Sequence, residues 1–244
     1  MKLSDFKVLT FDCYGTLIDW ESGIHAALQP LLTRAAPGVS RDAALETFAR
    51  HESAQETETP SMVYSKLLAT VHRRLAREWG VTAVDSEDER FGASVPDWPA
   101  FPDSSDALGY LKRHYALVIL SNVDRAGIAA SMRRLGVEFD AVFTAQDVGS
   151  YKPDPENFRY MLARLAERGF APGQILHTAQ SLFHDHVPAK QAGLATAWID
   201  RRHKIGGWGA TMPPPAAVKT DFRFESLQAM ADAHQAEVGR AGAG

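Results

Sequence analysis

The sequence predicts an α/β fold, a doubly wound Rossmann-like parallel sheet with an inserted helical cap domain. Two observations support this. Short apolar runs of strand length alternate with helical stretches over most of the chain, which is typical of parallel strands buried on both faces. One long interval, from Glu21 to about Trp98, contains no convincing strand and is instead a series of helical patterns.

Six apolar runs define the expected sheet. Strands are predicted at residues 8–11, 117–120, 141–144, 175–179 and 196–199, with a weaker one at 221–224. Helices are predicted between most of them, at 125–135, 157–168 and 188–192. Sheets of this kind bind ligands beyond the carboxyl ends of their strands, so the residues that follow each strand are the functional candidates.

The interval without strands predicts the cap. Its expected helices span residues 23–34, 41–56, 61–79 and 87–91. The predicted division is a core of residues 1–19 and 99–244, with a helical cap at 20–98. The tail from 231 to 244 is polar and small, and we expect its end to fray.

Composition narrows the functional classes. The formal net charge of −4 over 244 residues leaves no basic footprint for nucleic acid. No apolar run approaches the roughly 18 residues that span a bilayer, so we expect no membrane partner, and the N-terminus has no signal-peptide pattern. Cys13 is the only cysteine, which rules out an internal disulfide and favours a cytoplasmic location.

Asp12 is the first candidate for chemistry. It ends the apolar run 8–11 and is followed by a Gly15-Thr16 turn. A carboxylate at a strand end can attack carbon or phosphorus and form a covalent intermediate that water then hydrolyses. The alternative is an aspartate that caps a neighbouring turn.

Polar residues also follow three later predicted strands. Ser121-Asn122 follow the run 117–120, Lys152 lies in Tyr151-Lys152-Pro153-Asp154-Pro155, and Asp185 comes shortly after the run 175–179. Each alone is common in turns. Because the carboxyl ends of parallel strands meet at one edge, we expect them to gather around Asp12, with the Lys152 ammonium lowering the pKa of Asp12.

These motifs resemble those of the haloacid dehalogenase superfamily. Its phosphatases carry an acid where this chain has Tyr14, and Gly-Asp-Ser where it has Ala179-Gln180-Ser181. Asp12 and Asp185 beside one lysine would form a poor Mg²⁺ cage. The sequence Asp-x-Tyr-Gly-Thr over residues 12–16 resembles that of type II 2-haloacid dehalogenases, which need no metal or other cofactor.

The resemblance implies a reaction. Asp12 would displace halide from a small 2-haloalkanoic acid, and water would hydrolyse the aspartyl ester to release a 2-hydroxy acid. Arg50 in the predicted helix 41–56 would bind the substrate carboxylate, with Arg41 as its rival. The remaining assignments are catalytic roles for Lys152, Asp185, Ser121, Asn122 and Thr16, and substrate contacts for Tyr14, Gln180, Ser181 and His184.

The chain also departs from that pattern. Gln180 and Leu182 stand where the dehalogenases usually place Ser and Asn, and Phe158 replaces a tyrosine. A metal-dependent phosphatase, an idle binding protein for small acids and a hydrolase that opens a strained ring remain alternatives. His177, His184 and His186 do not have the spacing of a closed zinc site. Cap helices in such enzymes often pair, so a homodimer is possible.

Overall fold

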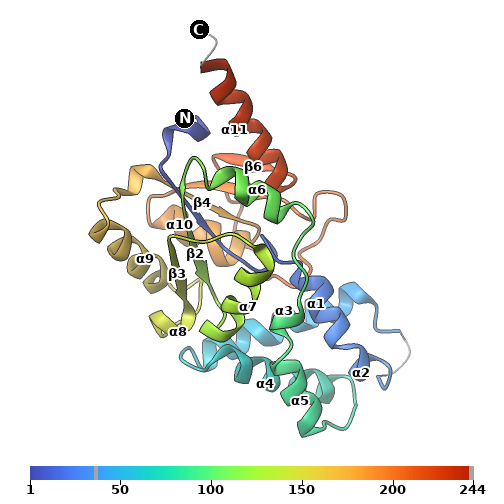
Figure 1. Ribbon diagram of the computed structural model, residues 1–244. Helices are drawn as coiled ribbons and strands as arrows, with labels where there is room; N and C mark the ends of the chain where they lie inside the picture. The colour runs from blue at the N-terminus through green and yellow to red at the C-terminus, as the bar shows by residue number, and fades with distance from the viewer. Residues whose placement is uncertain (36–37, 242–244) are drawn as a thin grey trace.

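A computed structural model describes residues 1–35 and 38–241 of the chain (Figure 1). Its centre is a six-stranded sheet in the order β3-β2-β1-β4-β5-β6, and all neighbouring strands are parallel. The strands are β1 (Val8–Phe11), β2 (Ala116–Ser121), β3 (Ala141–Thr144), β4 (Ile175–Ala179), β5 (Ala195–Ile199) and β6 (Phe222–Phe224). The predicted α/β fold with a doubly wound parallel sheet is confirmed.

Successive residues of each central strand point to opposite faces of the sheet, and both faces are buried. On β2, Leu117 and Ile119 belong to one hydrophobic cluster, whereas Val118 and Leu120 belong to another. The first cluster includes residues of α6 (Ser104–Leu111), α7 (Arg125–Leu135) and α11 (Leu227–Ala241), and the second includes residues of α9 (Pro155–Glu167) and α10 (Val187–Gln191). The period of two thus assembles a core on each side of the sheet.

The long interval between β1 and β2 is helical, as predicted. It contains α1 (Trp20–Ala27), α2 (Gln29–Leu32), α3 (Arg41–Glu58), α4 (Tyr64–Glu78) and α5 (Asp85–Gly92), which lie together beyond one end of the sheet (Figure 1). Where the sequence predicts one helix at 23–34, the structure has two. Pro30 has no backbone N–H to continue the first helix, so the chain starts a new turn at Gln29.

Two other segments differ from expectation. The sequence analysis did not predict α6, although Ala107, Leu108 and Leu111 bury its inner face. The C-terminal tail is helical through Ala241 because α11 packs Met230 into the core. Residues 242–244, where we expected fraying, lie outside the described part of the chain. Short helical turns complete the fold: Leu3–Asp5, α8 (Ala145–Val148), Val95–Asp97, Pro172–Gln174 and the π-turn Leu182–His186.

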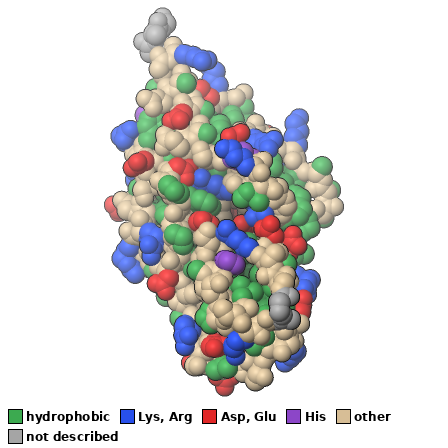
Figure 2. Space-filling view, turned by 90° about the vertical axis from the view of Figure 1, so that its right-hand side faces the viewer, with side chains coloured by type: hydrophobic (Ala, Val, Ile, Leu, Met, Phe, Trp, Pro, Cys, Tyr) green, Lys and Arg blue, Asp and Glu red, His purple; other side chains and the backbone are tan. Residues whose placement is uncertain are grey.

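The described part of the chain has no membrane-spanning helix, and one face of it has no single dominant charge. Among the described residues, no helix is long and apolar enough to cross a membrane. The face in Figure 2 carries Lys, Arg, Asp and Glu side chains of both signs, interspersed among apolar and neutral ones. On that face, therefore, neither positive nor negative side chains form a continuous patch.

Candidate active site

The polar strand ends meet where the strand order reverses. β1 lies between β2 and β4, so the chain leaves β1 towards one edge of the sheet and later returns to its other side. Asp12 follows β1, Lys152 comes after β3 and α8, and Asp185 lies in the π-turn after β4. This is the crevice in which open α/β sheets bind ligands.

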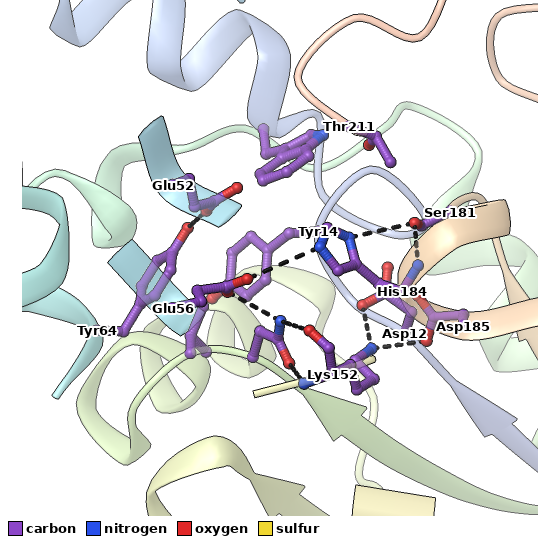
Figure 3. A pocket seen from close by; sticks show the side chains of 13 residues that line it. Asp12, Tyr14, Glu52, Glu56, Tyr64, Lys152, Ser181, His184, Asp185 and Thr211 are labelled. Atoms are coloured by element: carbon purple, nitrogen blue, oxygen red, sulfur yellow. Dashed lines mark hydrogen bonds and ion pairs between the residues drawn. The ribbon is translucent and has the colours of Figure 1, made fainter. Parts of the chain in front are cut away.

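Lys152 lies between the two carboxylates (Figure 3). Its Nζ donates to Asp12 Oδ1 at 2.9 Å, to Asp185 Oδ1 at 2.7 Å and to the carbonyl oxygen of Leu120 at 2.9 Å. All three side chains are buried. All three protons of the ammonium are therefore donated to protein oxygens, and one buried cation pairs with two buried anions.

The pKa shifts follow from this sharing. Burial and the attraction of Asp12 and Asp185 act in opposite directions on Lys152, and the attraction prevails, so its pKa is raised and it stays charged. For Asp185, burial is outweighed by Lys152 and by a hydrogen bond from His177, and its pKa lies well below the usual range. The pKa of Asp12 is raised, because burial and the charge of Asp185 outweigh Lys152. Our expectation of a lowered pKa at Asp12 was wrong in its net direction.

The turn after Asp12 fixes its second oxygen. Thr16 Oγ1 donates to Asp12 Oδ2 at 2.8 Å and accepts from the backbone N–H of Gln180 at 2.9 Å. Gly15 has φ +88°, and a Cβ there would lie 2.9 Å from Trp20 Nε1. Glycine thus allows the tight turn that returns Thr16 to Asp12.

Ser121 and Asn122 lie at the end of β2. Asn122 clamps Lys152: its Oδ1 accepts from the Lys152 backbone N–H at 2.7 Å, and its Nδ2 donates to the Lys152 carbonyl oxygen at 3.0 Å. The Nδ2 group also donates to Glu56 Oε1 at 3.0 Å. Ser121 Oγ is buried and, among the described residues, has no hydrogen-bond partner.

Tyr14 lines the cavity with its ring rather than with its hydroxyl. The ring packs edge-on against Trp98, and the hydroxyl bonds to Ser131 Oγ of α7 at 2.8 Å. Burial raises the pKa of this phenol well above its ordinary value, so it stays protonated. Burial likewise raises the pKa of the adjacent Cys13 thiol, which is therefore a neutral core residue at neutral pH.

Only some residues of the segment after β4 line the cavity. Ser181 caps the π-turn by accepting from His184 N at 2.9 Å, and both residues line the cavity. Burial lowers the pKa of His184 to about 4, which leaves the ring neutral. Gln180 lines a neighbouring depression and not the cavity itself, and its Oε1 accepts at 3.4 Å from the hydroxyl of Thr211, a residue of the cavity lining. The expected contact of Gln180 with substrate is not supported by this placement.

Neither candidate arginine reaches the site. Arg50 is exposed and pairs with Glu78 of α4 at 2.7 Å. On α3 the residues that face the cavity are Glu52 and Glu56, and Arg50 is two residues from Glu52, which turns it about 200° away. Arg41, the rival, donates to Ser22 Oγ at 3.1 Å and lines the neighbouring depression. The prediction of an arginine beside Asp12 is therefore corrected.

Two glutamates occupy the wall where the arginine was expected. Glu52 and Glu56 of α3 are buried, and Tyr64 of α4 donates from its hydroxyl to Glu52 Oε1 at 2.5 Å. Sequence reasoning missed both, although they continue the buried stripe of Leu45 and Phe48 at helical spacing. The full lining is Asp12, Tyr14, Trp20, Glu52, Glu56, Tyr64, Asn122, Val123, Lys152, Ser181, His184, Asp185 and Thr211.

The site was tested against a divalent metal, which the phosphatases of the resemblance require. Among residues 1–35 and 38–241, no group of three or more His, Cys, Asp or Glu side chains is arranged to hold a metal ion. Asp12 and Asp185 converge, but the Lys152 ammonium already lies between them. The donor set fits Mg²⁺ poorly, since this ion needs several free oxygen ligands.

His177 is another residue to which the sequence analysis assigned no role. It is fully buried on β4, where its Nε2 bonds to Asp185 Oδ1 at 3.0 Å and its Nδ1 to Thr10 Oγ1 at 2.9 Å. His186 instead bonds to the carbonyl of Ala179. His177 thus orients Asp185 from behind, away from the cavity.

The fold is thus α/β, and its site is a buried carboxylate bonded to a lysine where the strand order of the sheet reverses. A carboxylate in such a place can act as a nucleophile. A family model described as haloacid dehalogenase-like hydrolase matches residues 6–178. The chain belongs to this family of hydrolases, so the predicted resemblance is confirmed.

The chain is similar to both branches of the family that the sequence left open. It is 25% identical over 209 residues to (S)-2-haloacid dehalogenase 4A of Burkholderia cepacia, covering 82% of this chain and 85% of that one. It is 28% identical over 111 residues to pyrophosphatase PpaX of Bacillus velezensis, covering 46% and 50%. The structure of L-2-haloacid dehalogenase from Xanthobacter autotrophicus with chloropropionic acid covalently bound matches with a TM-score of 0.75 at 19% identity, covering 93% and 97%.

Proposed function

We propose that this hydrolase breaks a carbon–halogen bond of a small organohalide through a covalent ester on Asp12. The observation that carries the proposal is the closed arrangement of Asp12, Lys152 and Asp185. It presents one carboxylate as a nucleophile and leaves no room for a metal between the two acids. Tyr14, where a phosphatase would keep its acid, has its hydroxyl bound to Ser131.

The first step is a displacement at carbon. A carboxylate oxygen of Asp12 attacks the carbon from the side opposite the halogen, and the electron pair of the carbon–halogen bond leaves with the halide. Before the step, two carboxylates share one buried ammonium; afterwards the ester is neutral and Lys152 pairs with Asp185 alone. The negative charge passes to the halide, and its departure from the buried site, which removes the excess charge, favours ester formation.

The second step is hydrolysis of the ester. Asp185 Oδ2 is buried and has no hydrogen-bond partner among the described residues, so it can orient the attacking water. Water adds to the ester carbonyl, and collapse of the adduct restores the Asp12 carboxylate. One proton of the water goes to the departing alkoxide, which leaves as the alcohol, and the other is released to solvent. Lys152 Nζ, 2.9 Å from Asp12 Oδ1, offsets the negative charge on the adduct.

We also propose that residues 20–98 act as a cap over a core of residues 1–19 and 99–244. The support is that α3 provides one wall of the cavity while the sheet edge provides the other. The cavity leaves about 30 Å³, room for about two water molecules. We propose that the helices move away from the sheet when a substrate enters. The 2-haloalkanoic acids of the named relatives are the first substrates to test.

Halide release in the presence of a chelator tests the reaction. We expect chloride from at least one of chloroacetate, 2-chloropropionate, chloroacetamide and 2-chloroethylammonium, with enzyme-free blanks. Asp12→Asn should lower kcat/KM by at least about 10⁴-fold, since it removes the nucleophile, while the exposed Asp106→Asn control should not. In ¹⁸O-labelled water, a single turnover should label Asp12. Activity confined to phosphate esters and requiring Mg²⁺ would overturn the proposal in favour of a phosphatase.

A further inference from the structure

The cavity wall formed by α3 is acidic without a counter-charge. Glu52 Oε1 accepts from Tyr64, and Glu56 Oε1 accepts from Asn122. For the second oxygens, Glu52 Oε2 and Glu56 Oε2, the described residues provide no hydrogen-bond donor. Both side chains line the space opposite Asp12 (Figure 3).

The described lining contains no cation that is free to pair with a substrate carboxylate. Lys152 is the only Lys or Arg among those lining residues, and its three protons are already donated to Asp12, Asp185 and the carbonyl of Leu120. Four carboxyl groups and one lysine therefore surround the cavity. A substrate carboxylate in contact with Glu52 or Glu56 would lie on a buried surface without a cation to pair with, where an unpaired charge is costly.

A second observation on the same wall points to a polar ligand. His184 is 7% exposed, and its Nε2 is buried without a hydrogen-bond partner in the described structure. This nitrogen lies 3.8 Å from Glu56 Oε2, too far for a hydrogen bond. An unpartnered ring nitrogen beside a carboxyl group at a cavity wall leaves room for a ligand atom that bonds to both.

We propose that the site takes a small organohalide that carries an ammonium group, bound by Glu52 and Glu56 while its halogen-bearing carbon faces Asp12. This inference rests on the proposed function and names its substrate class. The rings of Tyr14, Trp20 and Tyr64 line the same cavity. Aromatic faces and carboxylates together are a favourable environment for an ammonium, because both offer negative potential.

Binding of such a cation is coupled to protons. Burial raises the pKa of Glu52 to about 8, so the proton of Glu52 is largely retained in the empty cavity at neutral pH. Burial and the neighbouring Glu52 also raise the pKa of Glu56 well above its ordinary value. An ammonium favours the ionised form, and its binding releases protons. The titratable and charged groups that face the two acids are Tyr64, Tyr151, Lys152, His184, Asp12 and Asp185.

Turnover of three two-carbon chlorides of similar size separates the charge classes. Chloroacetate is an anion, chloroacetamide is neutral, and 2-chloroethylammonium is a cation at pH 7. We expect kcat/KM for the cation to exceed that for chloroacetate by at least tenfold, with the amide between them. If chloroacetate is preferred, the inference is overturned and the dehalogenase proposal stands. If none releases chloride and phosphate esters react with Mg²⁺, the dehalogenase proposal fails instead.

Calorimetry decides the charge preference even without turnover. With the Asp12→Asn protein, 2-aminoethanol should bind more tightly than glycolate, and its apparent enthalpy should depend on the ionisation enthalpy of the buffer because protons are released. Tighter binding of glycolate, or binding of neither, overturns the inference.

Variants of the acidic wall complete the test. Glu56→Gln and Glu52→Gln should each reduce the preference for 2-aminoethanol over glycolate by at least tenfold and diminish the proton release. The matched control is Glu58→Gln, on the same helix but at the surface, where Glu58 pairs with Arg74. Equal preference in all three variants and in the Asp12→Asn parent protein would overturn the assignment.

Discussion

The two walls of the cavity, one at the sheet edge and one on α3, stabilise their buried carboxyl groups in different ways. On the sheet side, Asp12 and Asp185 are held by the Lys152 ammonium at 2.9 and 2.7 Å. On the helical side, Glu52 and Glu56 accept hydrogen bonds from neutral donors, Tyr64 and Asn122, and no Lys or Arg among the described residues is within ion-pair distance of them. The pKa of Asp185 is accordingly lowered, whereas that of Glu52 is raised to about 8.

This difference separates chemistry from recognition. A nucleophile must be charged before the substrate arrives, so the sheet side contains its own counter-charge. A recognition group can remain neutral until a ligand brings the opposite charge, because a buried acid without a partner takes up a proton instead of ionising. Asp12 and Asp185 thus have an internal counter-charge in direct contact, although burial and Asp185 still raise the pKa of Asp12, whereas Glu52 and Glu56 have no such contact.

Lys152→Met should have the largest effect, since it removes the counter-charge of the sheet side. Breaking a buried ion pair by removing one partner costs about 3–5 kcal/mol, and here two carboxylates lose theirs. We expect a lower Tm and a fall in kcat of at least about 10³-fold. Urea unfolding and halide release measure both. Lys66→Met, at an exposed position, is the control; similar losses in both variants would contradict the assignment.

Glu52 should make stability depend on pH. Below about pH 4.5 both the folded and unfolded chains hold its proton; between there and about pH 8 only the folded chain does. Unfolding then releases a proton, so the free energy of unfolding falls as pH rises, by at most about 1.4 kcal/mol per pH unit for one proton. Glu52→Gln should flatten this slope in urea unfolding at pH 5–9. An unchanged slope would show that Glu52 is ionised throughout.

His177→Leu tests how the sheet side is held from behind. The variant removes a hydrogen bond to the charged Asp185 Oδ1, worth about 1.5–3 kcal/mol. We expect kcat to fall about tenfold with KM unchanged, because His177 does not line the cavity. Thr10→Val, which removes only the other partner of His177, should have a smaller effect. A rise in KM without loss of kcat would contradict a positioning role.

The sheet side could be predicted from the sequence and the helical side could not. Buried parallel strands show as apolar runs, and their order brings Asp12, Lys152 and Asp185 to one edge whatever the details of packing. On α3 the choice between Arg50 and Glu52 depends on helix rotation. Both positions carry polar residues, so the sequence does not show which of the two side chains is buried. The packing of α4, which places Tyr64 against Glu52, decides it.

Arg50→Ala should have the smallest effect and is the sharpest test of that rotation. Arg50 pairs with Glu78 at the surface, where such pairs contribute about 0–1 kcal/mol. We expect kcat/KM for every chloride to stay within about twofold of the unmodified protein, and Arg41→Ala to behave alike. A tenfold rise in KM for chloroacetate alone would bring Arg50 into the substrate site. Helix α3 would then have to rotate when substrate binds, moving Glu52 and Glu56 away from it, and both walls of the cavity would carry cations.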